Sequence, residues 1–246
     1  MLPDHSVESQ LLTEFREAID DPQVDDAELR RFLRARNHDI GKAMEMLRKS
    51  LEWRKAVKFE EATTWKIPPE VQHAFPYFID GLDKDGRIVF YFPIGRWEVR
   101  KMLANGYKTE MEKLIYSSMA NLLKTIDDTA HEQFLIIIDL AGLTYWKVAH
   151  FETMQMVLQV FREYEQNFPE RLDKALVINS PWVLNCIFPM VKPLLTGTTL
   201  QKVQIFDSCA DKYLPAILDI IPISGLPSGF QEYNREIIQA QIITTN

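Results

Sequence analysis

The chain has 246 residues, of which 46% are hydrophobic and 26% are charged; this composition is that of a globular protein and excludes wholesale disorder. A formal net charge of -7 argues against binding nucleic acid through the overall electrostatic field, although a local basic patch could still meet an anionic group. No apolar run reaches the roughly 20 residues that span a bilayer, so any membrane contact is expected to be peripheral.

The first part of the chain, from about residue 7 to residue 57, has a helical pattern throughout. Asp25 and Glu28 form an Asp-x-x-Glu helix start, in which each carboxylate can accept from a free backbone N–H. Asp39 is placed to cap the following helix. These helices are short, so they are expected to pack on each other or on a larger unit.

Strand and helix patterns alternate after a connection over residues 63–74. Two apolar runs around a turn at Gly81 to Gly86 predict a β-hairpin. Further strands are expected at Phe134–Ile138, Ala175–Ile178 and Val203–Phe206, with helices at Lys108–Lys124 and Phe151–Tyr164. This order predicts an α/β fold with a mainly parallel sheet and one antiparallel hairpin.

The common catalytic motifs are absent, since the sequence has no GxSxG, GxxxxGK[ST], GxGxxG or HExxH. Asp139 ends an apolar strand, where α/β enzymes often place a carboxylate, but it is more simply explained as orienting the next turn. Cys186 and Cys209 lie in apolar or strand-like surroundings and are expected to be buried free thiols. We therefore expect no enzyme activity, no metal and no cofactor.

A helix is predicted to begin at Ser180–Pro181, because proline suits the first helical turn. One face carries apolar residues at three- and four-residue spacing: Leu184, Ile187, Phe188, Val191 and Leu195. The other face is also partly apolar, through Trp182, Val183 and Met190. A helix that is apolar on two sides either lies in a core or alternates between a cavity and a membrane, and periodicity leaves both open.

The chain resembles the CRAL-TRIO family from about Glu28 to Leu226. LRRFLRARNHDIGKAMEML, followed by WRK at Trp53 to Lys55, is similar to the family's N-terminal helical motif, and DKDGRIVFY is similar to its first hairpin. IIIDLAGL, FPERL, VINSP and VKPLL occur in the family's order and spacing. The C-terminal LPSGFQ departs from the family's LP-x-x-YGG.

The resemblance implies an N-terminal helical domain over 1–62, a lipid-binding α/β domain over 70–232 whose helices and mainly parallel sheet enclose an apolar pocket, and a C-terminal tail over 233–246. It also implies that residues 182–202 form a mobile gate, whose apolar residues are Trp182, Leu184, Ile187, Phe188, Val191 and Leu195. The pocket wall is expected to contain Phe134, Ile136, Ile138, Tyr91 and Tyr116.

Family members that bind phosphatidylinositol carry a small polar set at the headgroup, and the matching positions here are Arg36, Glu170, Thr199 and Lys202. Arginine and lysine suit phosphate, and glutamate can hold an inositol hydroxyl. The residue after Arg36 is basic in the family pattern but is Asn37 here. Alternatively, Arg36 could pair with Glu170 and simply tie the two domains together.

Phosphatidylcholine binders of the family carry hydroxyl side chains on the strand that corresponds to Phe134–Ile138, which has none here. Burying an unpaired polar headgroup against that wall costs a few kcal/mol, so the wall suits a tocopherol, retinoid, isoprenoid or sterol-like ligand better. Single hydroxyl contacts could come from any of Tyr91, Tyr107, Tyr116, Tyr145 and Tyr164.

The leading hypothesis is a cytoplasmic protein that binds an apolar ligand or a phospholipid and carries it between membranes through a gated pocket. It would have no cofactor besides the bound lipid, would bind membranes transiently and peripherally, and would not bind nucleic acid. The alternative is a lipid-sensing interaction module that regulates a partner protein or a downstream domain.

Overall fold

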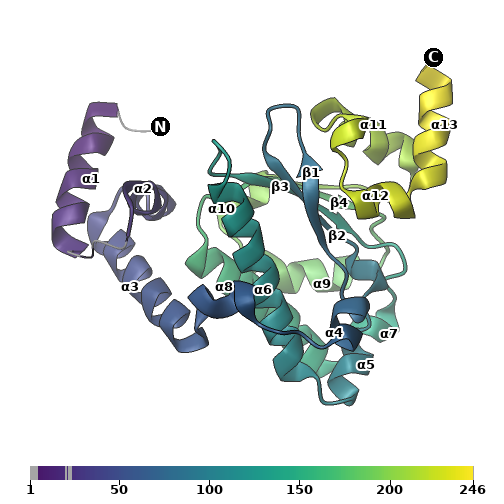
Figure 1. Ribbon diagram of the computed structural model, residues 1–246, viewed down its shortest axis with the longest axis horizontal. Coiled ribbons are helices and arrows are strands. Elements are labelled where there is room, and N and C mark those ends of the chain that lie inside the picture. Colours follow the sequence, from purple (N-terminus) through teal and green to yellow (C-terminus); the bar gives the residue numbers. More distant parts are fainter. Residues whose placement is uncertain (1–4, 20, 22–23, 246) are drawn as a thin grey trace.

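The computed structural model describes residues 5–19, 21 and 24–245, and it begins with helices that have a core of their own. These helices are α1 (His5–Ile19), α2 (Asp26–Ala35) and α3 (Ile40–Val57), and they lie together at one end of the molecule (Figure 1). Their shared core includes Phe15, Leu29 and Leu47. Both predicted helix starts are confirmed, since the Asp25 carboxylate accepts from the Glu28 N–H at 2.6 Å and that of Asp39 accepts from the Lys42 N–H at 3.0 Å.

The predicted connection over residues 63–74 is partly helical, because it contains the end of one short helix and the whole of another. The 3₁₀ helix η1 (Phe59–Thr64) follows α3, and α4 (Pro69–Ala74) begins at a proline, which has no N–H to leave unpaired. Phe59 and Ala62 of η1 are buried with Ala120 and Phe168. Therefore η1 belongs structurally to the second part of the chain, although it was expected within the N-terminal domain.

A five-stranded sheet forms the centre of the second part, in the order β1-β2-β3-β4-β5. Its strands are β1 (Phe78–Leu82), β2 (Ile88–Phe92), β3 (Phe134–Asp139), β4 (Leu172–Ile178) and β5 (Val203–Ile205). β1 pairs antiparallel with β2, and the other pairs are parallel, which confirms the predicted α/β fold. The hairpin turn comes slightly later than predicted, because Gly81 and Leu82 still belong to β1 and pair with residues of β2.

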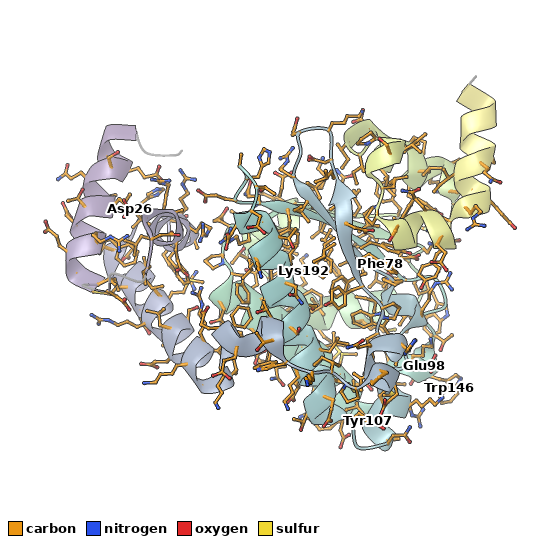
Figure 2. The ribbon with its side chains drawn as sticks, viewed as in Figure 1. Asp26, Phe78, Glu98, Tyr107, Trp146 and Lys192 are labelled. Atoms are coloured by element: carbon orange, nitrogen blue, oxygen red, sulfur yellow. The ribbon has the colours of Figure 1, made fainter. Side chains whose placement is uncertain are left out.

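Right-handed crossovers between strands that are neighbours in sequence place the connecting helices on one face of the sheet. These helices are α5 (Val99–Ala104), α6 (Lys108–Asp127), α7 (Tyr145–Val148) and α8 (Phe151–Asn167). The helices after β5 cover the opposite face: α11 (Ala210–Ile220), α12 (Ser228–Tyr233) and α13 (Arg235–Thr245). Phe78 of β1 lies beside α12, where it touches Gly229 (Figure 2).

The C-terminal segment that was expected to be a tail is instead helix α13, and its Ile238 lies in the sheet's core with only 7% exposure. Within the described residues, no helix is long and apolar enough to cross a membrane.

The two faces of the sheet are covered to different extents. The face that we call the α6–α8 face carries the alternate side chains Ile88, Phe90, Phe92, Phe134, Ile136 and Ile138. Phe134 is buried with Leu122 and Ile126 of α6, but Phe92, Ile136 and Ile138 are only half-buried. β3 is the central strand, so this partial exposure means that helices cover the α6–α8 face incompletely toward the carboxyl ends of the strands.

The predicted gate segment forms α9 (Leu184–Val191), the 3₁₀ helix η3 (Lys192–Leu194) and α10 (Gly197–Gln201). The helix therefore begins later than Ser180–Pro181 and ends before Leu195. Its buried residues are Val183, Ile187 and Val191, which pack on residues of α8 that include Leu158 and Phe161. The predicted apolar face is partly wrong, because Val183 lies inward whereas Leu184 and Phe188 are only half-buried.

Candidate functional site

The four residues proposed for a headgroup line one cavity, which we call the polar cavity. Arg36 follows α2, Glu170 lies between α8 and β4, Thr199 lies in α10, and Lys202 caps α10. The cavity volume is about 20 Å³, which is room for about one water molecule. Three segments far apart in the sequence thus bring two cations, a carboxylate and a hydroxyl together.

The charges in the polar cavity are only partly paired. Lys202 Nζ lies 3.4 Å from Glu170 Oε2 and donates to the Leu172 carbonyl at 2.7 Å. Arg36 makes no salt bridge with any described residue, and its Nη1 donates to the Ala35 carbonyl at 3.0 Å. The alternative Arg36–Glu170 tie is therefore not formed.

A different ion pair links the N-terminal helices to the sheet. Arg31 of α2, which is 8% exposed, donates through Nη1 to Glu132 Oε2 at 3.1 Å, just before β3. The N-terminal helices are therefore tied to the sheet through Arg31, and not through Arg36 as the alternative interpretation had it.

Local backbone structure fixes the positions of Glu170 and Thr199. Glu170 has a left-handed backbone, with φ of 59°, and its carbonyl accepts from Gln133 Nε2 at 3.0 Å. Such a conformation in a non-glycine residue costs free energy and is often retained at functional sites. Thr196 caps α10 by accepting from the Thr199 N–H at 3.2 Å, and the two threonine hydroxyls lie 2.9 Å apart.

Two residues of α8 that were not predicted as headgroup residues also line the polar cavity. They are Tyr164 and Glu165, and the Tyr164 hydroxyl and Glu165 Oε1 are both buried without a hydrogen-bond partner among the described residues. Tyr164 had been named only as one of several tyrosine hydroxyls. Both residues lie a few positions before the FPER motif, and no sequence pattern marks them as parts of a binding site.

The apolar wall holds together only in part. Phe134, Ile136 and Ile138 share the α6–α8 face, but Tyr91 points to the opposite face, where it packs among residues of α11 and α12. The prediction of Tyr91 as a wall residue is wrong, because odd and even positions of β2 face opposite sides of the sheet.

Tyr116 is also misplaced by the sequence reading. It packs edge-on against Trp53 of α3, with ring centroids 5.5 Å apart, and its hydroxyl lies 3.3 Å from Glu163 Oε1. It therefore lies at the contact with the N-terminal helices rather than on the sheet wall.

Asp139 is held in a buried network at the end of β3. Its carboxylate accepts from the Tyr91 hydroxyl at 2.8 Å, from Asn179 Nδ2 at 2.8 Å and from the Ala141 N–H at 2.9 Å. Burial, followed by the charge of Asp139, raises the pKa of Tyr91 far above its usual value, so the phenol stays protonated and donates. This geometry fits the structural role for Asp139 in orienting the turn.

Aromatic side chains are exposed beside the start of the gate segment. Trp182 is 67% exposed and stacks on Tyr145, with ring centroids 6.1 Å apart and an interplanar angle of 14°. Trp146, which is 72% exposed, lies at the edge of the molecule (Figure 2) and contacts Tyr145 edge-on. We call Tyr145, Trp146 and Trp182 the exposed aromatic cluster. Cys186, expected to be buried, is also exposed on α9.

A second hollow lies on the outer side of α6. It has a volume of about 360 Å³, and its lining includes Trp65, Phe75 and Tyr77 from around α4 together with Ser117 and Asn121 of α6. None of the predicted site residues lines it. The described residues contain no cluster of histidine, cysteine or acidic side chains that could hold a metal ion.

Comparison with known proteins identifies a family that the chain matches. Residues 72–230 match the CRAL/TRIO domain family. The Sec14 cytosolic factor of Schizosaccharomyces pombe is 28% identical over 217 residues, which cover 84% of this chain and 74% of the relative. The SEC14 cytosolic factor of Candida glabrata is 28% identical over 231 residues, which cover 90% of this chain and 75% of the relative.

The fold is also similar to a solved structure. The crystal structure of Sfh5 superposes with a TM-score of 0.71 at 16% identity, and the superposition covers 99% of this chain and 100% of that chain. Since the family match spans well over half of the sequence and the predicted motifs fall on the expected elements, the chain belongs to the CRAL-TRIO family of lipid-binding proteins.

Proposed function

We propose that the protein binds phosphatidylinositol and transfers it between membranes, with the headgroup in the polar cavity and the acyl chains along the α6–α8 face. One observation carries this proposal: Arg36, Glu170, Thr199 and Lys202 come from three segments far apart in the sequence and line a single cavity. That cavity borders apolar surface, because its lining residue Leu172 also packs in the cluster beneath the α6–α8 face.

The charges of the polar cavity match those of an inositol phosphate. Arg36 has no salt-bridge partner among the described residues, so its guanidinium is available to bind phosphate oxygens in a bidentate manner. Lys202 adds a second cation, and the Glu170 carboxylate can accept from the ring hydroxyls.

The α6–α8 face suits the acyl chains. Phe92, Ile136 and Ile138 are half-buried on central strands, so apolar surface is left for an acyl chain to cover. Each methylene group that moves from water onto such a surface contributes about 0.8 kcal/mol.

Uptake requires the gate segment to move. A cavity of about 20 Å³ is far below the roughly 300 Å³ at which small-molecule sites begin, so the segment from α9 to α10 must shift to admit a headgroup. The exposed aromatic cluster beside α9 suits peripheral docking at a membrane, because tryptophan and tyrosine favour the headgroup region. We propose a cytoplasmic carrier of this kind, without enzyme activity.

A second ligand class is favoured by one feature of the wall. β3 offers only apolar side chains to the α6–α8 face, and this suits a tocopherol, retinoid, isoprenoid or sterol-like molecule as well as an acyl chain. Such a ligand would leave the polar cavity to water.

The first experiment identifies the bound lipid. Purified protein is denatured, and its lipid extract is examined by mass spectrometry. Phosphatidylinositol near one molecule per chain is expected; a stoichiometric apolar ligand would favour the second class, and an extract without lipid after expression in several hosts would contradict carriage.

Vesicle-to-vesicle transfer then separates a carrier from a lipid-sensing module, which would bind the lipid without moving it. Substituting both Lys202 and Glu170 with alanine is expected to reduce phosphatidylinositol transfer strongly. Lys212→Ala with Asp207→Ala is the matched control, because that pair has a 2.6 Å ion pair on the surface beside α11, away from the cavity. Equal transfer by both double variants would contradict the assigned headgroup site.

A further inference from the structure

The contact between α3 and α8 contains buried polar atoms that lack partners. Among the described residues, the buried side-chain atoms without a hydrogen bond are Ser50 Oγ, Trp53 Nε1, Arg54 Nε, the Tyr164 hydroxyl and Glu165 Oε1. All of these belong to α3 or α8. Buried polar groups in proteins are nearly always paired, so each exception calls for a physical explanation.

Tyr164 and Glu165 differ from the other three because they also line the polar cavity. Both residues therefore lie at the cavity that a headgroup would occupy, whereas Ser50, Trp53 and Arg54 do not line it. The orphaned atoms at the cavity are one donor and one acceptor, which is the pair that a headgroup with a phosphate and hydroxyls requires.

The Tyr164 ring is fixed by its neighbours. It packs against Phe168, with ring centroids 6.2 Å apart, and contributes to the apolar clusters on both sides of α8. The Leu172 backbone lowers the pKa of the Tyr164 hydroxyl, as an N–H that donates to the hydroxyl oxygen does, and no acceptor for the hydroxyl proton is found among the described residues. Burial, and then the charge of Glu165, raises the pKa of Tyr164 well above its usual value, so the hydroxyl keeps this proton at neutral pH.

Glu165 is held in place by the gate segment. Its Oε2 accepts from the Thr196 N–H at 3.3 Å, at the start of α10. This bond fixes the carboxylate while leaving Oε1 buried and unpaired. The same side chain thus contacts the gate segment through one oxygen and also belongs to the lining of the polar cavity.

We propose that Tyr164 donates its hydroxyl proton to the lipid phosphate and that Glu165 Oε1 accepts from a headgroup hydroxyl, so that both residues determine headgroup specificity. This inference rests on the proposed binding of phosphatidylinositol. It adds an uncharged donor to the two cations and a second carboxylate to Glu170.

Tyr164→Phe tests the donor, with Tyr116→Phe as the matched control. Tyr116 is another half-buried tyrosine of the same region, but its hydroxyl has a partner in Glu163. Uptake of phosphatidylinositol from phosphatidylcholine vesicles is expected to weaken about tenfold in Tyr164→Phe, the factor for one hydrogen bond to a charged group. Tyr116→Phe should bind as the wild type does.

Thermal unfolding of the lipid-free proteins separates a ligand contact from a structural role. Tyr164→Phe removes a buried hydroxyl that has no internal partner, so its melting temperature should equal or exceed that of the wild type. Tyr116→Phe loses a hydrogen bond and should melt slightly lower. A lower melting temperature for Tyr164→Phe would reveal an internal partner and overturn the inference.

Glu165→Gln tests the acceptor, because it keeps the shape but replaces one carboxylate oxygen by an amide donor. It is expected to weaken phosphatidylinositol uptake as well. Unchanged uptake by both variants would overturn this inference alone, whereas a wild-type protein that takes up no phosphatidylinositol would overturn the proposed function too.

Discussion

Replacing Asp139 by alanine should destabilise the protein without any direct effect on lipid contacts. The carboxylate is 2% exposed and accepts three hydrogen bonds, from Tyr91, Asn179 and Ala141. The substitution leaves the fully buried Tyr91 hydroxyl without this acceptor, at about 1–3 kcal/mol. Asn179 and Ala141 are half-buried, so their N–H groups can bond to water instead. We therefore expect a loss of about 2–3 kcal/mol in the free energy of unfolding.

Urea unfolding of Asp139→Ala, Tyr91→Phe and the double variant measures this loss. Tyr91→Phe should cost only about 1–2 kcal/mol, because Asp139 keeps its two other donors. The double variant should be less destabilised than the sum of the two single variants, since its unpaired hydroxyl is gone. A loss below about 1 kcal/mol in Asp139→Ala, accompanied by weaker lipid binding, would refute the structural role and make Asp139 a ligand contact.

The remaining predictions concern a close backbone contact, the N-terminal helix and the membrane. Gly95→Ala should destabilise by more than about 2 kcal/mol, because the new Cβ would lie 2.2 Å from the Ala141 carbonyl oxygen, while Gly197→Ala, with no atom within 4 Å of its Cβ, should be tolerated in the same unfolding assay. The hydrogen bond from Arg34 lowers the pKa of Glu8 from 4.5, its value in the unfolded chain, to about 2. The contribution of this bond to stability is therefore complete above pH 4.5 and is lost as the pH falls toward 2. Glu8→Gln should cost about 1 kcal/mol at pH 7, discounted for the exposure of Arg34, and the difference from the wild type should shrink between pH 4.5 and 2. Trp182→Ala should slow vesicle-to-vesicle transfer and leave the melting temperature unchanged, and an unaltered transfer rate would contradict membrane docking through the exposed aromatic cluster.

Much of the fold follows from local sequence signals. The continuous apolar run from Phe134 to Ile138 identified the central strand, because a strand covered on both faces has no polar alternation. Asp25 and Asp39 gave the helix starts, because their carboxylates bond to backbone N–H groups a few residues away. Such signals depend on near neighbours in sequence and need no knowledge of the tertiary structure.

The errors arise where distant segments decide the outcome. Ser180–Pro181 has the pattern of a helix start, and the chain does turn there, because the Leu184 N–H donates to the Pro181 carbonyl at 3.0 Å. The Ser180 N–H is held by the Phe206 carbonyl beyond β5 at 3.0 Å, and the regular α-helix begins only at Leu184. The face of α9 that is buried is likewise determined by α8, because α8 packs against Val183, just before α9, rather than against Leu184. Tyr91 was assigned to the wrong face because β2 is apolar on both sides, so its sequence does not tell which side the helices cover.

The headgroup residues came from the family resemblance, and the structure explains why composition alone could not find them. Arg36, Glu170 and Lys202 are ordinary surface residue types, and only the packing of α2 near the end of α8 brings them together. Tyr164 and Glu165 were not proposed for the headgroup from the sequence, because their distinguishing property is a lack of partners in the folded state. That property has no counterpart in a sequence pattern.

In the proposed headgroup site, the segment that closes the polar cavity also selects the headgroup. α10 is held at its start by the bond from Thr196 to Glu165 and at its end by the pair between Lys202 and Glu170. A headgroup that enters the cavity competes for these same side chains. It therefore binds only when its own hydrogen bonds replace those that it breaks. A phosphate alone can satisfy Lys202 but leaves Glu170 unpaired, and a hydroxyl alone does the reverse. Because an unpaired, partly buried charge costs more than an unmade neutral hydrogen bond, the proposed site favours ligands that carry both groups.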